Sequence, residues 1–572
     1  MREGVDRREG RGSCRKVGAL CVVLARLRAD SGWIPPAWLR RGSRQRVFAG
    51  EWEGVTLGEL RSAARANGWM LGLAAMGALG LAVMLITTPL GGGLGGDSYY
   101  YVSGARDLLA GEGFTRPAAD GTFRPITHFP PLFSVCLALL TGLGLDTTQA
   151  ARWFNAGLFG VNVFLVGWLI WRGTQSWLSS LGGALIFLAS PAMLAVHSWV
   201  LSEPLFLCCL LLAITWLSFY LERGRRRDLV VSAILASFAC LTRYVGLALV
   251  AAAVLAILLW PGRRWWKRAQ SAAVFAALSL AAPAGWFARN LALVGSPTNR
   301  GLQFHLPDSS KLLDALNTFS LWLLPGRVPA TLRLGLAAAV IMGLLALTIV
   351  FLWKGPPSGE RRPVPWIAGW LLLVYPLSIL ASLSLLDAST PLDDRILSPL
   401  LAAGLMLGIC TAQGALSRTA TVRPARVIIG TILASFVVLT AARGVGKMLQ
   451  LRADGQGYAS RGWRDSHLVG WVREHPEEGP IYSNELDALY LLTGRQAYQV
   501  PIRWDPVRAE ERQDFPEQLA RMRERIAGEG AVLVLFNSLA SQQAFLPSEA
   551  ELAEGLLPAF QASDGVVYMD GR

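Results

Sequence analysis

The sequence predicts an all-α polytopic membrane protein with about eleven transmembrane helices, followed by a small C-terminal extracytoplasmic α/β domain. Composition is the first observation behind this prediction. Of the 572 residues, 53% are hydrophobic and only 16% are charged. The mean hydropathy is +0.39, so the chain is more apolar than a soluble protein of this size needs to be. The second observation is that long apolar segments recur along most of the chain.

These apolar segments define the expected spans. A span needs about 20 apolar residues, and fewer where a helix ends in an aqueous cavity. The expected spans cover residues 69–90, 154–171, 177–196, 200–221, 229–242, 245–260, 271–288, 331–353, 364–386, 396–416 and 426–446. Segment 130–145 is instead expected to be a re-entrant or in-plane helix. If it crossed the membrane, four basic loops would face outward, against the positive-inside rule.

This topology predicts three regions. Residues 1–68 are rich in arginine and lack periodicity, so we expect a basic, disordered cytoplasmic segment. Residues 69–446 form the transmembrane domain, with a first outer loop at 91–153. Residues 447–572 are expected to form the α/β domain, because PIYSN and GAVLVLFNS are typical of strands and ELDALYLLTG of a helix that ends at a glycine.

Charge and cysteine content exclude several classes of protein. The net charge is +14, but the basic excess lies before and between the spans, which indicates membrane orientation and not nucleic-acid binding. The seven cysteines lack paired spacing, so neither a disulfide framework nor a zinc site is predicted. Neither Gly-x-Ser-x-Gly nor His-Glu-x-x-His is present, which argues against soluble hydrolase chemistry.

The segment GGGLGGDSYYYVSGARDLLAGEGF, residues 91–114, directly follows the first span. It places Asp97 at the membrane surface, just before a short amphipathic helix that is expected to stop at Gly111. A carboxylate there can act as a base on a substrate that also lies in the membrane. The alternative is that Asp97 caps the helix and the tyrosines lie in the aromatic belt of the interface.

Further polar residues are predicted at the same face of the membrane. A charged residue at membrane depth costs about 2.5–3.5 kcal/mol on insertion scales and usually marks a cavity. The residues are His128, Glu203, Arg243, Tyr244, Arg289, Asn290, Arg300, Asp393, Asp394 and Arg395. Each arginine, taken alone, could instead extend its guanidinium group to the membrane interface without contributing to a site. Because all of these residues are predicted at the same face of the membrane, we expect them to form a single site.

The motifs occur in the order GGDSYYYVSGARDLLAGEGF, HFPPLF, AARWFNAGLFGVNVF, ASPAML, SEPLF, LTRYVGLAL, WFARNLALVGSPTNR and DDRILSP. In this order they resemble the GT-C glycosyltransferases, in the bacterial branch related to protein O-mannosyltransferases and aminoarabinose transferases. The resemblance covers roughly residues 69–500, and IYSNELDALYLLTGR after the spans is part of it. It implies a GT-C-like fold, with Asp97 as the catalytic base and Glu203 as a second acidic position where relatives often carry Asp. His128 stands where relatives often carry a basic or metal-linked residue.

The implied activity is transfer of a hexosyl or pentosyl group from a polyprenyl-phosphate donor to an acceptor hydroxyl, with inversion. Arg243, Arg289 and Arg395 would bind the donor phosphate, since arginine holds phosphate bidentately, and Tyr244 and Asn290 adjoin two of them. The reaction would take place at the outer face of the inner (plasma) membrane.

Several points stay open at the level of the sequence. Glu203 or His128 could orient the acceptor or hold a divalent metal ion. The acceptor could be a glycan, a lipid or a protein, and membrane lipids are expected partners. The alternative function is a lipid or glycan transporter or flippase without transferase chemistry, although the sequence shows no repeat pair with matching broken helices.

Overall fold

The fold is described from a computed structural model of the chain. It describes residues 57–302, 304, 306, 308–355, 362–387, 389–418, 423–476, 479–505 and 510–571. Most of the segment that is expected to be disordered, residues 1–56, therefore lies outside the described residues.

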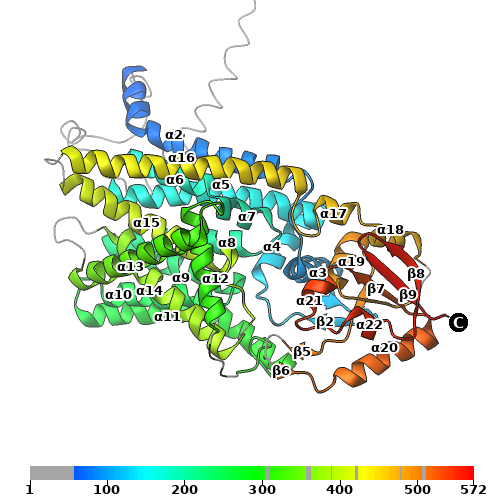
Figure 1. Cartoon of the computed structure of the whole chain (residues 1–572). Coiled ribbons are helices and arrows are strands. Elements are labelled where there is room, and N and C mark those ends of the chain that lie inside the picture. The colour runs from blue at the N-terminus through cyan, green and yellow to red at the C-terminus, as the bar shows by residue number, and fades with distance from the viewer. Residues whose placement is uncertain are drawn as a thin grey trace, which may run out of the picture. The chain divides into compact units, whose positions relative to one another are not determined.

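Long helices make up the first part of the described chain (Figure 1). The longest are α2 (Leu57–Thr87), α5 (Thr147–Thr174), α8 (Glu203–Arg223), α11 (Trp265–Val294), α13 (Ala330–Lys354), α14 (Pro363–Leu385), α15 (Asp394–Arg418) and α16 (Arg423–Asp454). Within the described residues, 8 helices are long and apolar enough to cross a membrane, or 9 if a bent pair counts as one span. The protein is therefore a multi-pass membrane protein.

Two expected spans are shorter helices, α9 (Arg226–Thr242) and α10 (Gly246–Leu258). They meet at a break around Arg243 and Tyr244, where the sequence predicted one. Because these helices fall below the length that defines a full span, the total of eleven spans stays a prediction.

One expected span contains a bend. Residues 177–196 were expected to form one span, and in the structure they form two helices, α6 (Trp177–Ala189) and α7 (Pro191–Ser198), which meet at 58°. Ser190 interrupts the helix, and its Oγ accepts a hydrogen bond from the Met193 N–H at 3.4 Å. Pro191, which has no N–H to donate, takes the first position of α7. The two residues together start a new helix.

The first loop contains α3 (Gly96–Ala110), α4 (Leu132–Thr141) and a hairpin of β1 (Thr115–Pro117) and β2 (Phe123–Pro125). Helix α3 ends at Gly111, whose φ of 86° suits glycine, as predicted. Helix α4 has 10 residues and is therefore about 15 Å long, too short to cross a hydrocarbon core of about 30 Å. This length agrees with an in-plane or re-entrant helix. The hairpin and α12 (Ser309–Leu323) were not predicted.

The C-terminal region is an α/β unit, as the sequence predicted. Its five-stranded sheet has the order β4-β3-β7-β9-β8. The strands are β3 (Ile481–Ser483), β4 (Ala497–Gln499), β7 (Val532–Phe536), β8 (Leu557–Ala562) and β9 (Gly565–Met569). Strands β4, β3 and β7 are parallel, whereas β9 is antiparallel to both of its neighbours. All five residues of β7 are buried, as expected for a central strand with both faces covered.

Six helices and a pair of two-residue strands complete the described part of this unit. They are α17 (Arg461–Arg464), α18 (His467–Glu474), α19 (Leu486–Thr493), α20 (Phe515–Glu529), α21 (Leu539–Gln542), α22 (Glu549–Leu552), β5 (Trp504–Asp505) and β6 (Glu510–Glu511). Buried side chains form one core with Leu468, Val534 and Val567, and a second with Leu533 and Met522. Val534 and Leu533 are neighbours on β7 and point to opposite faces of the sheet, so both faces are covered.

Helix α8 lies at the centre of the helical part. In its apolar window, 83% of the residues are buried, compared with 11% in the windows of α13 and α16. A span surrounded by other helices can start with a charged residue only if protein groups compensate that charge, because lipid and water are both excluded. Glu203 is the first residue of α8. Its partners therefore define the candidate site.

Candidate active site

Four charged side chains form a continuous chain of ion pairs. Glu203 Oε1 lies 2.5 Å from Arg243 Nη1 and accepts a hydrogen bond from Arg395 Nε at 2.9 Å. Arg395 also donates through Nη2 to the carboxylate of Asp97. We call Asp97, Glu203, Arg243 and Arg395 the charged tetrad. All four were predicted site residues, and with two cations and two anions their formal charges cancel.

The tetrad runs from the interior of the protein to an accessible surface. The Glu203 side chain is 1% exposed and that of Arg243 is 18% exposed. At the other end, Arg395 is 27% exposed and Asp97 is 36% exposed. A ligand can therefore reach the tetrad at the Asp97–Arg395 pair, whereas the Arg243–Glu203 pair forms its buried end.

Two asparagines of α5 fix the segment that carries Glu203. Asn155 Nδ2 donates to the Trp199 carbonyl at 2.7 Å and to the Leu201 carbonyl at 3.3 Å. About two helical turns further along α5, Asn162 Nδ2 donates to the Pro204 carbonyl at 3.0 Å. Both asparagines are buried, so these hydrogen bonds hold the backbone on either side of Glu203 in place. The sequence had not singled out either asparagine.

Two neighbouring aspartates fix the helix start that carries Arg395. Asp393 Oδ1 accepts hydrogen bonds from the Arg395 N–H at 3.0 Å and the Ile396 N–H at 3.2 Å, which caps α15. Asp394 Oδ1 accepts from Trp322 Nε1 on α12 at 2.7 Å. Asp393 therefore holds the backbone of Arg395, and Asp394 ties the helix start to α12; among the described contacts, neither carboxylate forms an ion pair with Arg395.

Asp97 lies in the first turn of α3, but it does not cap that helix. The N-cap residue is Gly95, whose N–H donates to Ser98 Oγ at 3.0 Å. The preceding Leu94 accepts a hydrogen bond from the Tyr458 N–H at 2.8 Å. Gly457 approaches so closely that a Cβ there would lie 2.0 Å from the Leu94 oxygen, at a φ of +56°, so only glycine fits. Segments distant in the sequence thus hold the Asp97 loop.

Tyr244, Arg289 and Asn290 also come together, but they bind the backbone of the first loop and not the tetrad. Arg289 donates to the Ile126 carbonyl at 3.1 Å and to the Phe114 carbonyl at 3.3 Å. Asn290 Nδ2 and Tyr244 Oη both donate to the Thr127 carbonyl, at 2.9 and 3.0 Å. This geometry positions the loop, and a direct role of these residues in donor binding stays a prediction.

His128 follows this anchored backbone and packs among aromatic rings. Its ring centroid lies 4.5 Å from that of Tyr100 and 4.3 Å from that of Phe129. Burial, assisted by the positive charge of Arg300, lowers the pKa of His128 to about 4. The imidazole is therefore neutral at pH 7 and can accept or donate one hydrogen bond. Arg300 itself pairs with Asp387 at 3.1 Å.

A divalent metal ion was left open by the sequence. Across the described ranges, no group of three or more His, Cys, Asp or Glu side chains is arranged to hold a metal ion. The two carboxylates of the tetrad, Asp97 and Glu203, pair with arginine.

The C-terminal region brings one further carboxyl to the Asp97 loop. Asp487, in the first turn of α19, has its Oδ2 3.0 Å from the position that a Cβ on Gly96 would take. The rings of Tyr99 and Tyr490 meet edge to face beside it, at 5.0 Å. Burial, with a contribution from Glu485, raises the pKa of Asp487 to about 7. The sequence showed Asp487 only as an acidic residue in a helix start, a common stabilising pattern.

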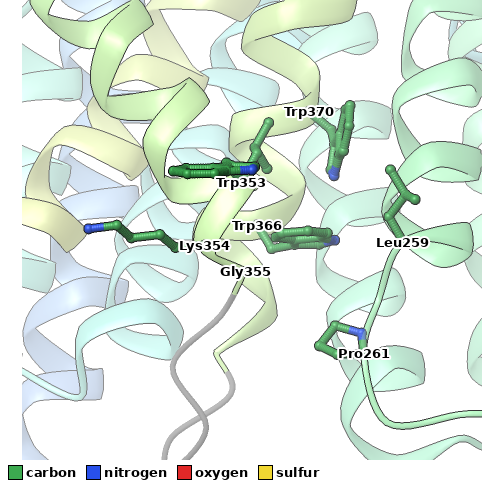
Figure 2. Close-up of a pocket in the computed structure, with 8 residues that line it drawn as sticks. Leu259, Pro261, Trp353, Lys354, Gly355, Trp366 and Trp370 are labelled. Carbon is green, nitrogen blue, oxygen red and sulfur yellow. The ribbon is translucent and has the colours of Figure 1, made fainter.

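A cavity of about 400 Å³ lies elsewhere, among the ends of α10, α13 and α14. Figure 2 shows Trp353, Trp366 and Trp370 around it, with Lys354 at its edge. Trp366 is near the start of α14, whereas Arg395 follows its end, so the cavity and the tetrad lie at opposite ends of a 23-residue helix. Tryptophans grouped in this way are typical of the membrane interface.

Comparison with known proteins gives a family match and a fold. Residues 128–287, a minority of the chain, match the family model described as dolichyl-phosphate-mannose-protein mannosyltransferase. No curated protein sequence matches the chain. The crystal structure of ArnT from Cupriavidus metallidurans bound to undecaprenyl phosphate aligns with a TM-score of 0.54 at 15% identity, covering 88% of this chain and 98% of that one. The apo structure of the same ArnT aligns with a TM-score of 0.55, at the same identity and coverage.

These matches define the class of fold. The protein has an ArnT-like fold, as the predicted resemblance to GT-C glycosyltransferases implies. The region that matches the family model contains His128, Glu203 and Arg243, but neither Asp97 nor Arg395. The ion pairs of the tetrad connect Glu203 and Arg243, inside the matched region, with Arg395 and Asp97, outside it.

Proposed function

We propose that this protein is an integral membrane glycosyltransferase that moves a sugar from a polyprenyl-phosphate donor to an acceptor hydroxyl. The observation that carries the proposal is the charged tetrad, in which the partly exposed Asp97 carboxylate pairs with Arg395 and Glu203 links Arg395 to a second guanidinium group, that of Arg243. In an ArnT-like fold, this arrangement offers cations for a lipid phosphate and a base for an acceptor. One of the two similar structures is bound to undecaprenyl phosphate, which supports a polyprenyl carrier for this chain as well.

The chemistry needs two charged groups in different roles. Arg395, the more exposed arginine, binds the donor phosphate, and the deeper Arg243 adds positive potential behind it. Asp97 takes the proton of the acceptor hydroxyl as that oxygen bonds to the anomeric carbon. The bond between the anomeric carbon and the phosphate oxygen breaks, and polyprenyl phosphate leaves with both electrons of that bond. A single displacement of this kind inverts the anomeric configuration.

Glu203 acts in this scheme as a positioning residue. Its carboxylate is almost fully buried, and one oxygen accepts from both arginines, so it cannot reach an acceptor in this arrangement. It instead holds the two guanidinium groups together, a task that a buried carboxylate performs well because its charge is fully compensated. The sequence analysis had given Glu203 as a second acidic position beside the base Asp97, with orientation of the acceptor or metal binding as its possible roles.

The test is turnover of a lipid-linked sugar by the purified protein. A panel of undecaprenyl-phosphate hexoses and pentoses is incubated with the protein in detergent and with hydroxyl acceptors from the cell envelope, and the release of undecaprenyl phosphate is measured. We expect one donor to be consumed with formation of a glycosylated acceptor. If no donor is consumed, while reconstituted vesicles move the lipid from one leaflet to the other, the flippase alternative holds and the transferase proposal fails.

The mechanism also requires a definite orientation. We propose that the tetrad faces the outer side of the inner (plasma) membrane, because the basic segment ERGRRRD, residues 222–228, follows the other end of α8. A reporter fused after Asp454, at the end of α16, is expected to be extracytoplasmic, and one placed within residues 222–228 to be cytoplasmic. Cytoplasmic labelling at Asp454 would place the tetrad on the opposite side and contradict the proposed sidedness.

A further inference from the structure

We propose that Asp97 and the phosphate of the lipid ligand compete for the same guanidinium group, so that binding of a polyprenyl phosphate releases Asp97 from Arg395. This inference rests on the proposed function and extends it, because it states when the base becomes available. In the structure Asp97 forms an ion pair with Arg395. When the phosphate binds, it takes the place of Asp97 on Arg395.

Geometry supports this competition. Arg395 uses Nε for Glu203, at 2.9 Å, and Nη2 for Asp97. The guanidinium edge that would suit an incoming phosphate is therefore already occupied by two carboxylates. A phosphate that binds bidentately to this edge must displace one of them. Without such a displacement, Arg395 could offer the phosphate only the other edge, formed by Nη1 and Nη2.

Burial decides which carboxylate leaves. Glu203 is 1% exposed and is also bound by Arg243 at 2.5 Å. If Glu203 moved away, the guanidinium of Arg243 would be left inside the helical bundle without its carboxylate partner. Asp97 is 36% exposed and, among the described contacts, has its ion pair with Arg395 alone. Water can solvate Asp97 when it leaves, and so the exchange takes place at the outer pair.

Charge balance favours the same exchange. The tetrad is formally neutral, and a phosphodiester adds one negative charge. With Asp97 still in place, the phosphate and the Asp97 carboxylate would face each other across one guanidinium, and like charges at such a distance repel. When Asp97 moves away, the phosphate joins Arg243, Glu203 and Arg395, and that set is again neutral.

The exchange also makes catalysis depend on the donor. In the structure the Asp97 carboxylate accepts a hydrogen bond from Arg395, and that oxygen is not available to an acceptor hydroxyl. Once the phosphate has replaced Asp97 on Arg395, the carboxylate is available to the acceptor hydroxyl while the donor is in position. The acceptor is thus activated only in the presence of the donor phosphate.

The test measures binding of undecaprenyl phosphate without any sugar, so it does not depend on turnover. The purified protein in detergent is titrated with undecaprenyl phosphate as wild type, Asp97→Asn, Arg395→Ala and the double variant. Competition predicts that Asp97→Asn binds the lipid at least threefold more tightly than wild type, because a neutral amide competes for Arg395 less strongly than a carboxylate does. Arg395→Ala is expected to bind at least tenfold more weakly.

The double variant separates competition from a general loss of negative charge. If Asp97 acts through Arg395, then Asp97→Asn gives no gain in affinity when Arg395 is already Ala. An equal gain in both backgrounds would contradict the exchange. Asp120→Asn is a matched control, since Asp120 also pairs with an arginine, Arg124, but in the exposed hairpin. Its affinity should equal that of wild type.

The outcomes distinguish the inference from the proposed function. If undecaprenyl phosphate binds to wild type and Asp97→Asn binds it equally or more weakly, the exchange is wrong and the transferase proposal stands. If neither wild type nor any folded variant binds the lipid phosphate, the proposed function itself fails. Thermal unfolding of each variant in the same detergent shows that the compared proteins are folded.

Discussion

Asp97→Asn is expected to slow sugar transfer at least about 100-fold, the lower end of the effect for loss of a general base. The amide keeps the size of the side chain and can still accept a hydrogen bond from Arg395, but it cannot take a proton from the acceptor. Transfer is measured with purified wild type and variant at matched concentrations, with saturating donor. Because binding of the lipid phosphate is measured separately, a loss of turnover cannot be attributed to a loss of donor.

The structure removes one competing explanation of this result. If Asp97 capped α3, its replacement could act through the helix, but the N-cap is Gly95 and the contact there involves Ser98. Ser98→Ala therefore serves as the control, since it disturbs the helix start and leaves the carboxylate in place. Near-normal transfer by Asp97→Asn would show that Asp97 is not the base.

Arg243→Ala is expected to lower the free energy of unfolding by about 3–5 kcal/mol, the usual effect of removing one partner of a buried ion pair. The substitution leaves Glu203, 1% exposed, with Arg395 as the only other cation of the tetrad. In addition, Glu203 Oε2 is buried and, in the described part of the chain, has no hydrogen-bond partner. The effect is measured as loss of thermal stability of the detergent-solubilised protein.

A paired substitution gives this prediction its control. Replacing both members, as Arg243→Met with Glu203→Leu, removes the charge and its partner together, and such apolar replacements are often neutral or stabilising. We therefore expect the double variant to recover most of the lost stability but not donor binding, which needs the guanidinium groups. If Arg243→Ala is as stable as wild type, the Arg243–Glu203 pair is not a buried ion pair that stabilises the protein.

Much of the fold was predictable because apolar periodicity and length are local signals. The break at Arg243 and Tyr244, the short helix α4 and the buried strand β7 all follow from a few neighbouring residues. The bend at Ser190 was missed although Pro191 marked it, because residues 177–196 are apolar throughout and were treated as one span. Helix α12 was missed because its segment was assigned as a loop between spans.

The site was predictable as a set of residues but not as a set of contacts. Sidedness grouped the arginines and carboxylates, since charge at membrane depth is rare, and four of them form ion pairs with one another in the structure. It could not show that Arg395 meets Asp97 whereas Arg289 meets backbone carbonyls. Tertiary packing decides between these two partners, because an arginine can donate hydrogen bonds to the backbone carbonyls of a loop as well as to a carboxylate or a ligand. Asn155 and Asn162 gave no signal, since a polar residue within a span does not reveal which carbonyl it will bind.

The backbone contacts around the Asp97 loop have a consequence for the order of folding. Gly93 pairs with Trp199, and Leu94 pairs with Gly457, which follows the last long helix. Asp97 and Arg395 are themselves separated by 298 residues. Contacts between such distant segments form late, because the intervening chain must first be synthesised and ordered. A nascent chain can therefore insert most of its helices while the Asp97 loop still lacks its final supports, and the site is completed only after Gly457 has been synthesised.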